Sequence, residues 1–280
     1  MSVYVILQGG LANQMFQLAM GRIVGKLLDR KVVLLDDWLR RTRPNVTPRA
    51  FALHSLNQKP TPSEGRLLAA KVWASEIPVL NRLLRRCDPS LVTDHRTYSS
   101  QDILKWNAHP ALLLSGYWQN QGTLFEEFRK LLLDGFRSRE ASSIPAHPCM
   151  RGVIAIHVRR GDYVSNPTAR RHHGLLPVDY YERAIAQLKL RCDISRLEIF
   201  SDDPLWCERD LKFEFPKSVM PMSMDPIQDL WRMSHYEGLI IANSSFSWWA
   251  AWLSQAEVVA PAQWTTAGTS VYIPRHWVRV

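Results

Sequence analysis

Short apolar runs alternate with segments of helical periodicity along most of the chain. The apolar, β-branched runs predict strands at 3–7, 31–35, 111–114, 153–158, 197–200, 239–242 and 258–260, with a brief strand near Val219. Apolar residues three and four positions apart predict helices over 14–28, 64–74, 123–133, 178–190, 205–211, 227–234 and 246–254. Strands that alternate with helices indicate right-handed βαβ crossovers and a parallel sheet, so we predict an α/β fold.

Two stretches interrupt this pattern. Residues 38–100 carry arginines and prolines and show only patches of helical spacing. Residues 136–151 have little periodicity, and the serines and prolines that recur in them are typical of a linker. We therefore predict two domains, residues 1–140 and residues 150–280. The strand–helix alternation of the second is typical of a Rossmann-like domain.

The composition is that of a globular protein, with 280 residues of which 46% are hydrophobic and 22% charged. No apolar run approaches the roughly 20 residues that span a bilayer. The first residues enter a predicted strand without a leader pattern, so we expect a cytoplasmic protein. The four cysteines show neither C-x-x-C pairing nor histidines at zinc-finger spacing, so we expect neither a zinc site nor disulfides.

The net charge of +9 favours an anionic partner, which could be a nucleotide, a nucleic acid or an anionic membrane surface. Two groups of arginines supply much of it: Arg40, Arg41 and Arg43, and Arg82, Arg85 and Arg86. Such groups can attract anionic lipids by about 1 kcal/mol per residue, or they can form an ordinary solvated surface. Basic and aromatic residues are interleaved, but no recognition motif for nucleic acid accompanies them, so we expect no nucleic-acid partner.

The densest chemistry follows the predicted strand at 153–158. His157, Arg159, Arg160 and Asp162 lie within six residues at the carboxyl end of that strand, the edge where open α/β sheets bind ligands. Two arginines there favour a phosphate group, because a guanidinium presents paired donors to its oxygens. The alternative is an arginine–aspartate ion pair that only fixes a turn.

Two further strand ends carry polar residues, Ser201–Asp203 and Asn243–Ser245. Parallel strands would bring them to the same edge as the arginines. Ser244 and Ser245, with the amides that open the helix at Phe246, can donate to diphosphate oxygens. Asp202 can accept two hydrogen bonds from a guanine edge, although an aspartate before a proline is also an ordinary helix cap. Together these groups predict a site for guanosine diphosphate.

No Asp-x-Asp sequence occurs in the chain, so arginines rather than a divalent cation would have to offset the charge of a nucleotide sugar. We therefore expect neither a metal nor another cofactor. Trp248, Trp249 and Trp252 share one predicted helix. Their spacing favours core packing, and stacking on a sugar face is the alternative.

Five short motifs recur in the order of a known family. They are GGLANQMFQ at 9–17, HVRRGDY at 157–163, HGLL at 173–176 with DYY at 179–181, FSDD at 200–203, and IIANSSFSWWAAW at 240–252. The chain resembles the bacterial α-1,2-fucosyltransferases of glycosyltransferase family 11. The resemblance covers both ends and the whole second half, whereas residues 38–100 match poorly.

The resemblance implies a GT-B architecture, in which two Rossmann-like domains flank a cleft. It implies transfer of L-fucose from GDP-β-L-fucose to the 2-hydroxyl of a terminal galactose, with inversion and without metal. The first domain would take the galactoside acceptor and the second would bind GDP-fucose. Bacterial relatives often fucosylate lipid-linked glycans, so a lipid-linked acceptor and peripheral association with the inner face of the membrane are further expectations.

The same resemblance assigns roles to residues. Arg159 would contact the donor diphosphate and stabilise the leaving group, and Asp162 would orient the arginines. The remaining contacts to GDP-fucose would come from Asn13, His157, Arg160, Asp202, Ser244, Ser245 and Phe246. Ala12 stands where the family signature usually has glycine. No glutamate follows the arginine motif, where some related enzymes carry a catalytic base; the loop there offers only Ser165, Asn166, His172 and His173.

Two alternatives to this function remain. One is a GT-B enzyme that uses another nucleotide sugar, and the other is a basic nucleic-acid-binding protein supported only by charge and aromatic residues.

Overall fold

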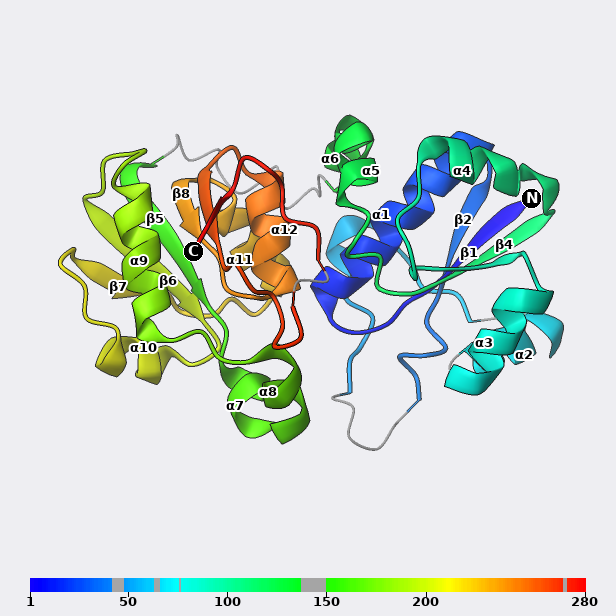
Figure 1. Cartoon of the computed structure of the whole chain (residues 1–280), viewed down its shortest axis with the longest axis horizontal. Coiled ribbons are helices and arrows are strands. Elements are labelled where there is room, and N and C mark those ends of the chain that lie inside the picture. The colour runs from blue at the N-terminus through cyan, green and yellow to red at the C-terminus, as the bar shows by residue number, and fades with distance from the viewer. Residues whose placement is uncertain (42–47, 63–65, 76, 137–149, 269–270) are drawn as a thin grey trace. The chain divides into compact units, whose positions relative to one another are not determined.

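The computed structural model describes residues 1–280 except 42–47, 63–65, 76, 137–149 and 269–270. The chain divides into two compact units, Met1–Ser138 and Arg139–Val280 (Figure 1). Most of the predicted linker at 136–151 lies outside the described residues. Neither end of it is a loop: Phe136 is the last residue of helix α6 (Arg129–Phe136), and strand β5 (Met150–Val158) begins one residue before the predicted end of the linker.

Four parallel strands form the sheet of the first unit, in the order β2-β1-β4-β3. They are β1 (Ser2–Ile6), β2 (Lys31–Leu35), β3 (Leu91–Thr93) and β4 (Ala111–Ser115). β1 is central, since Ser2 is opposite both Lys31 of β2 and Ala111 of β4. Along the chain, β2 is added on one side of β1, β3 forms the far edge on the other side, and β4 then takes the place between β3 and β1. β1 and β4 therefore lie side by side at the centre of the sheet, and their carboxyl ends lie at the edge where open α/β sheets bind ligands.

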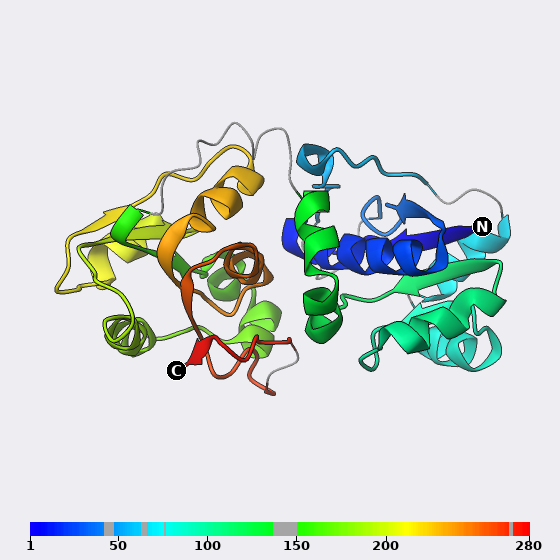
Figure 2. The ribbon, with the colours of Figure 1, turned by 90° about the horizontal axis from the view of Figure 1, so that it is seen from above.

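Helix α1 (Leu11–Leu28) packs against this sheet at very short range and runs along its strands (Figure 1, Figure 2). A Cβ atom at Gly21 would lie 2.7 Å from Val5 Cγ2, and one at Gly25 would lie 2.6 Å from Val32 Cγ2. Only glycine allows this approach. The helix begins three residues before the predicted start, directly after Gly10.

The remaining helices of the first unit are α2 (Arg66–Ser75), α3 (Pro78–Cys87), α4 (Ser100–Lys105), α5 (Gly122–Glu127) and α6, with 3₁₀ turns η1 (His54–Leu56) and η2 (Trp106–Ala108). The predicted helix at 64–74 corresponds to α2. The one predicted at 123–133 is divided into α5 and α6 at Phe128. α4 was not predicted, although Ser99 and Asp102 form a capping box at its start.

Six parallel strands form the sheet of the second unit, in the order β10-β9-β8-β5-β6-β7. They are β5, β6 (Arg196–Ser201), β7 (Lys217–Val219), β8 (Tyr236–Ile240), β9 (Glu257–Ala260) and β10 (Val278–Arg279). The predicted parallel, Rossmann-like sheet is confirmed. β5 lies at its centre between β8 and β6, so the arginine motif leaves the sheet at its switch point.

The helices of the second unit are α7 (Gly161–Ser165), α8 (Pro167–His173), α9 (Val178–Leu188), α10 (Pro204–Asp210), α11 (Pro226–Met233) and α12 (Ser245–Leu253). The loop predicted after the arginine motif is wrong, because α7 and α8 occupy it. On one face of the sheet, α9 packs Tyr181 and Leu188 against Ile154 and Ile156 of β5. Since side chains alternate along a strand, His157 points to the opposite face.

The three tryptophans of α12 are core residues. Trp248, Trp249 and Trp252 are fully buried, and the rings of Trp248 and Trp252 stack with centroids 6.1 Å apart. Trp248 Nε1 also donates to the Tyr272 carbonyl oxygen at 2.6 Å. This confirms core packing as their role and leaves no ring face for a sugar. None of the helices in the described ranges is both long and apolar enough to cross a bilayer.

Candidate active site

Three neighbouring strands of the second unit end beside one another. The chain leaves β5 through Arg159–Asp162, β6 through Asp202 and Asp203, and β8 through Asn243–Ser245. All pairs of strands are parallel, so these three segments lie on one edge of the sheet. The structure therefore brings together the three groups that the sequence predicts to meet.

The guanidinium of Arg159 lies between two carboxylates. Its Nη2 is 2.6 Å from Asp162 Oδ1, and its Nη1 is 2.7 Å from Asp202 Oδ2. The Arg159 side chain keeps 26% of its surface exposed. A guanidinium has five N–H donors, so this pairing leaves donors for a ligand on the exposed side. Asp162 and Asp202 thus fix the plane of the group that would meet a phosphate.

Arg160 is held in a different way. Its Nε is 2.9 Å from Asp203 Oδ2, and its guanidinium lies 3.9 Å from the centre of the Trp206 ring. Its backbone N–H donates to Asp202 Oδ1 at 2.8 Å. Two cations and three carboxylates therefore share this edge, and the carboxylates orient both arginine side chains. The ion pairs considered as an alternative in the sequence are present, and they belong to the same cluster.

Asp202 is central to this cluster because both of its carboxylate oxygens are engaged. Oδ2 faces Arg159 and Oδ1 accepts from the Arg160 backbone. A Cβ atom at Gly161 would lie 2.5 Å from Asp202 Oδ2, so the close approach requires glycine at the start of α7. A carboxylate oxygen accepts more than one hydrogen bond, so guanine binding by Asp202 is compatible with this geometry and stays a prediction.

His157 is a neutral residue in this site. It is buried, and burial followed by the positive charge of Arg159 lowers its pKa from 6.5 to about 3. Its ring lies 5.6 Å from that of Phe246, at the start of α12. Its Nδ1 has no hydrogen-bond partner among the described residues. His157 therefore brings no positive charge to this site at neutral pH.

The start of α12 supplies the third side of the site. Ser244 is its N-cap residue and accepts from the Phe246 backbone N–H at 3.4 Å. Ser244 is buried, whereas Ser245 and Phe246 are half-buried. The first amides of a helix have no partner within it and carry partial positive charge. Ser245, Phe246 and these amides are thus placed where an anion can be bound.

Tyr163 and His173, to which the sequence assigned no contact with each other, connect these elements. Their rings stack with centroids 4.5 Å apart and planes 8° apart, and the Arg159 guanidinium lies 5.5 Å from the Tyr163 ring. Tyr163 Oη donates to the Asn243 carbonyl oxygen at 3.1 Å, and Asn243 Nδ2 donates to the His173 carbonyl oxygen at 2.8 Å. Helices α7 and α8 are thereby fixed to the end of β8.

A sequence signal for α8 was available. Asn166 precedes Pro167, and its Oδ1 accepts from the backbone N–H groups of Thr168 and Ala169. Asparagine as N-cap with proline at the first helical position is a helix-start pattern. Gly174, with φ of +73°, follows the last helical residue, as glycine commonly does.

Asn13 lies in the first unit, near the start of α1. Its Oδ1 accepts from Gln119 Nε2 at 2.9 Å. Asn13 follows β1 and Gln119 follows β4, so this hydrogen bond joins the segments that follow two adjacent parallel strands. The predicted contact of Asn13 with a nucleotide stays a prediction. Ala12, which replaces the usual glycine, is buried in α1.

Among the residues that the structure describes, no three His, Cys, Asp or Glu side chains are grouped as metal ligands would be. The three aspartates of the cluster instead face arginines. Independence from metal stays a prediction.

The sequence matches known proteins along most of its length. The family described as Glycosyl transferase family 11 matches residues 93–271. The O-antigen biosynthesis glycosyltransferase WbnK of Escherichia coli is 31% identical, over 94% of each chain. An α-1,2-colitosyltransferase of Escherichia coli is also 31% identical, over 100% of this chain and 99% of its own length. The galactoside 2-α-L-fucosyltransferase SEC1 of Bos taurus is 28% identical over 41% of this chain and 32% of its own.

Solved structures share the fold at low identity. The Arabidopsis thaliana FUT1 mutant R284K, in complex with GDP, superposes with a TM-score of 0.55 at 12% identity, over 99% of this chain and 71% of that one. The α-1,6-fucosyltransferase NodZ, co-crystallised with GDP, gives a TM-score of 0.51 at 12% identity, over 90% and 92% of the two chains. The predicted fold class is confirmed: two α/β units of the GT-B type, each with a sheet of parallel strands.

Proposed function

Since the chain belongs to glycosyltransferase family 11, we propose that it transfers L-fucose from GDP-β-L-fucose to the 2-hydroxyl of a terminal galactose, with inversion. The observation that carries the donor assignment is the oriented pair Arg159 and Arg160, which lies beside the start of α12 at the switch point of the second sheet. A diphosphate needs two or more groups of donors that converge in this way. The name of the bovine relative, a galactoside 2-α-L-fucosyltransferase, supports the acceptor position.

In the proposed reaction, the 2-hydroxyl oxygen of galactose attacks the anomeric carbon of fucose. The bond from that carbon to the β-phosphate oxygen breaks, its electron pair stays on GDP, and the hydroxyl proton is released. Negative charge therefore grows on the diphosphate in the transition state. Arg159, fixed by Asp162 and Asp202, supplies oriented donors to that charge without having to reorganise. Asp162 is a positioning residue in this scheme, since its carboxylate is committed to Arg159.

A second donor has specific support. The relative that covers nearly all of the chain is named an α-1,2-colitosyltransferase, and colitose is fucose without one hydroxyl group. The arginine cluster binds the diphosphate and does not distinguish these sugars. α-1,2-Transfer of colitose is therefore the alternative function.

The deciding experiment is GDP release by the purified chain, with GDP-fucose, GDP-colitose and GDP-mannose offered alongside a panel of β-galactosides. We expect the highest kcat/KM with GDP-fucose and an α-1,2 linkage in the product by NMR. A higher kcat/KM with GDP-colitose would select the alternative. A different linkage, or no galactoside product with either donor, would overturn the proposed acceptor position.

We also propose peripheral association with anionic membranes, which would bring the enzyme to lipid-linked acceptors. Helices α2 and α3 lie side by side (Figure 1) and expose large apolar side chains: 51% of Trp73, 69% of Val79 and 51% of Leu83. Arg82 and Arg86 are exposed on α3 among them. Apolar residues flanked by arginines are typical of helices that lie in a membrane interface.

The other arginines of this hypothesis do not add to this surface in the part of the chain that the structure describes. Arg40 is paired with Asp36 at 2.9 Å, and Arg43 and the side chain of Arg85 lie outside the described residues. The α2–α3 face, defined by Trp73, Val79, Arg82, Leu83 and Arg86, is therefore the surface to test. An ordinary solvated surface remains its alternative.

A further inference from the structure

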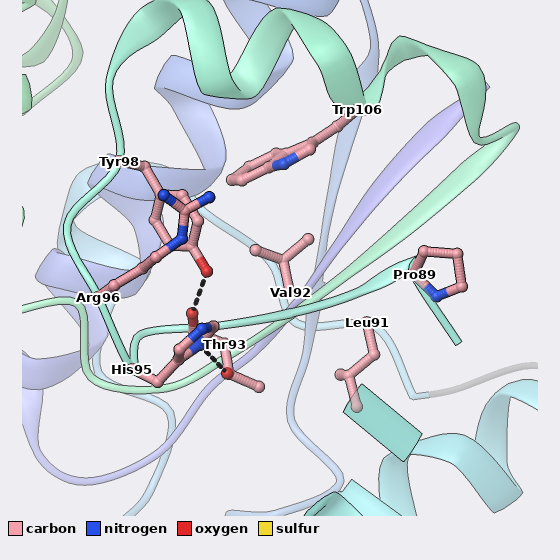
Figure 3. A pocket seen from close by; sticks show the side chains of 8 residues that line it. All are labelled: Pro89, Leu91, Val92, Thr93, His95, Arg96, Tyr98 and Trp106. Atoms are coloured by element: carbon pink, nitrogen blue, oxygen red, sulfur yellow. Dashed lines mark hydrogen bonds between the residues drawn. The ribbon is translucent and has the colours of Figure 1, made fainter. Parts of the chain in front are cut away.

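A pocket of about 240 Å³ runs along β3, the open edge strand of the first sheet (Figure 3). Trp106 and Val92 line it from opposite sides, and Tyr98 and Arg96 close one end. Pockets that bind drug-sized ligands in other proteins are larger, about 300–1,000 Å³. This pocket therefore has the size for one small ring rather than for a nucleotide.

Contacts among its own side chains fix the walls of the pocket. Tyr98 is buried, and its Oη donates to the Thr93 carbonyl oxygen at 2.8 Å. The Arg96 guanidinium lies 4.5 Å from the centre of the Tyr98 ring. The Trp106 ring meets that ring edge-on, with centroids 5.0 Å apart and planes 79° apart. A ligand thus enters a site whose side chains lose little freedom on binding.

The chemistry of the walls fits a pyranose ring. Trp106 and Val92 present apolar surface to the C–H face of a sugar, as aromatic residues in sugar sites do. Arg96 offers N–H donors to hydroxyl oxygens. Its side chain is 54% exposed, and its Nη2 lies 3.8 Å from Asp102 Oδ1. Thr93 Oγ1 is 2.9 Å from His95 Nδ1, which adds a hydroxyl and an imidazole to the rim. Apolar and polar walls side by side are what a sugar requires.

The pocket is also connected to the segment that follows β4. Gln121 Oε1 accepts from the Tyr98 backbone N–H at 2.9 Å, and Gln121 Nε2 donates to the Arg96 carbonyl oxygen at 2.7 Å. Asp94 Oδ2 accepts from the backbone N–H of Trp118 at 3.1 Å. The pocket therefore belongs to the same loop system as Gln119, which bonds to Asn13.

The structure assigns this pocket as a subsite for one pyranose ring of the acceptor glycan. The assignment rests on the proposed function, because the groups suited to the nucleotide lie in the second unit. It adds that the edge of the first sheet selects the acceptor, through Trp106 and Arg96.

The test is steady-state kinetics of Trp106→Ala and Arg96→Ala with GDP-fucose and a β-galactoside such as lactose. We expect the KM for lactose to rise about tenfold, because the removal of one aromatic contact or one charged hydrogen bond lowers the affinity by about this factor. The KM for GDP-fucose and the slow hydrolysis of GDP-fucose without acceptor should stay within about twofold. An unchanged KM for lactose in both variants, or an equal rise in the KM for GDP-fucose, would overturn the subsite.

Matched controls are available in the same unit. Trp73→Ala and Arg86→Ala remove an exposed tryptophan and an exposed arginine outside the pocket, and both should keep the wild-type KM for lactose. Trp106→Phe keeps an aromatic ring and should recover most of the affinity if Trp106→Ala is unstable. A rise in the KM for lactose in Trp73→Ala as large as the rise in Trp106→Ala would contradict the assignment.

Direct binding separates this subsite from the proposed function. Saturation-transfer NMR with methyl β-D-galactopyranoside and the whole chain should show contacts that Trp106→Ala and Arg96→Ala lose and Trp73→Ala keeps. If the wild type binds the galactoside in this way but transfers no fucose, the proposed function fails and the pocket stands. If it transfers fucose while the pocket variants bind normally, the pocket fails alone. Binding of GDP instead of the galactoside in this pocket would also overturn the assignment of the subsite.

Discussion

At the scale of single residues, Arg159 has the most informative environment. Its guanidinium contacts Asp162 and Asp202, which come from the ends of two adjacent strands. Removing one partner of such a cluster leaves the other charges without compensation. A substitution here therefore needs a control for folding as well as for activity.

We expect Arg159→Ala to reduce kcat by a factor on the order of 10²–10³, the usual loss when one oriented donor to a developing anion is removed. Arg159→Lys should not recover it, because an ammonium cannot contact two carboxylates and a phosphate in one plane. Arg183→Ala, which removes an exposed arginine paired with Asp179 in the same unit, should be neutral. Rates near wild type in both Arg159 variants would exclude this residue from the mechanism.

Gly161→Ala tests the close approach between α7 and Asp202. The added Cβ would lie 2.5 Å from Asp202 Oδ2, so the carboxylate must move away from Arg159. We expect GDP to bind about tenfold more weakly by calorimetry while the far-ultraviolet circular dichroism is unchanged. Ser165→Ala, at the other end of α7, is the control. An unchanged Kd for GDP would show that the position of Asp202 does not control nucleotide binding.

The lowered pKa of His157 predicts that the free energy of unfolding depends on pH. Its pKa is about 3 when folded, because of burial and then the charge of Arg159, and 6.5 is the ordinary value. Between these values the unfolded chain binds a proton that the folded chain does not, so stability falls as pH falls. The slope is about 1.4 kcal/mol per pH unit for one such group. His173, whose pKa burial lowers to about 4, acts in the same direction.

The measurement is the urea-unfolding free energy at pH 7.5, 6 and 5. We expect a decrease toward pH 5, and a smaller decrease in His157→Gln, which has no titrating group at this position. Equal slopes for wild type and His157→Gln would mean that His157 is solvated enough to protonate in the folded chain.

At the scale of elements, the α2–α3 face can be tested apart from catalysis. Arg82→Ser with Arg86→Ser should abolish sedimentation with phosphatidylglycerol vesicles at low salt, since each arginine near an anionic surface contributes about 1 kcal/mol. Binding should also disappear in high salt, because screening shortens the reach of the charges. Arg209→Ser, an exposed arginine of the second unit, should bind as wild type does. No sedimentation of the wild type at low salt, or equal binding by the double variant, would end this proposal.

At the scale of the whole molecule, we expect fucose transfer to continue in excess EDTA. In the proposed function the charge on the leaving diphosphate is offset by Arg159, Arg160 and the start of α12, so the proposal assigns no role to a divalent cation. The assay is GDP release before and after EDTA treatment, followed by addition of Mg²⁺ or Mn²⁺. Activity lost in EDTA and restored by either ion would contradict the role given to the arginines.

Much of the fold follows from local sequence. The apolar run at 153–158 is a strand because β-branched residues fit a buried sheet, and α9 forms because Tyr181, Ile185 and Leu188 share one helical face. Short elements carry too few residues for a period to be visible. β3 has three residues and α7 has five, and both were missed.

The sequence by itself determined which residues follow the strand ends, and parallel strands then bring Arg159, Asp202 and Ser244 to one edge. It could not determine how they are paired. The contact between Arg159 and Asp202 joins residues 43 positions apart and depends on β5 lying beside β6 and on glycine at 161. The neutral state of His157 likewise arose only when distant segments packed around it. The stacking of Tyr163 on His173 and the pocket of residues 89–106 form within shorter stretches of the chain, but both depend on how side chains pack, which no period in the sequence indicates. Local propensity acts between neighbours in the chain, whereas burial, charge pairing and cavity shape are set by neighbours in space.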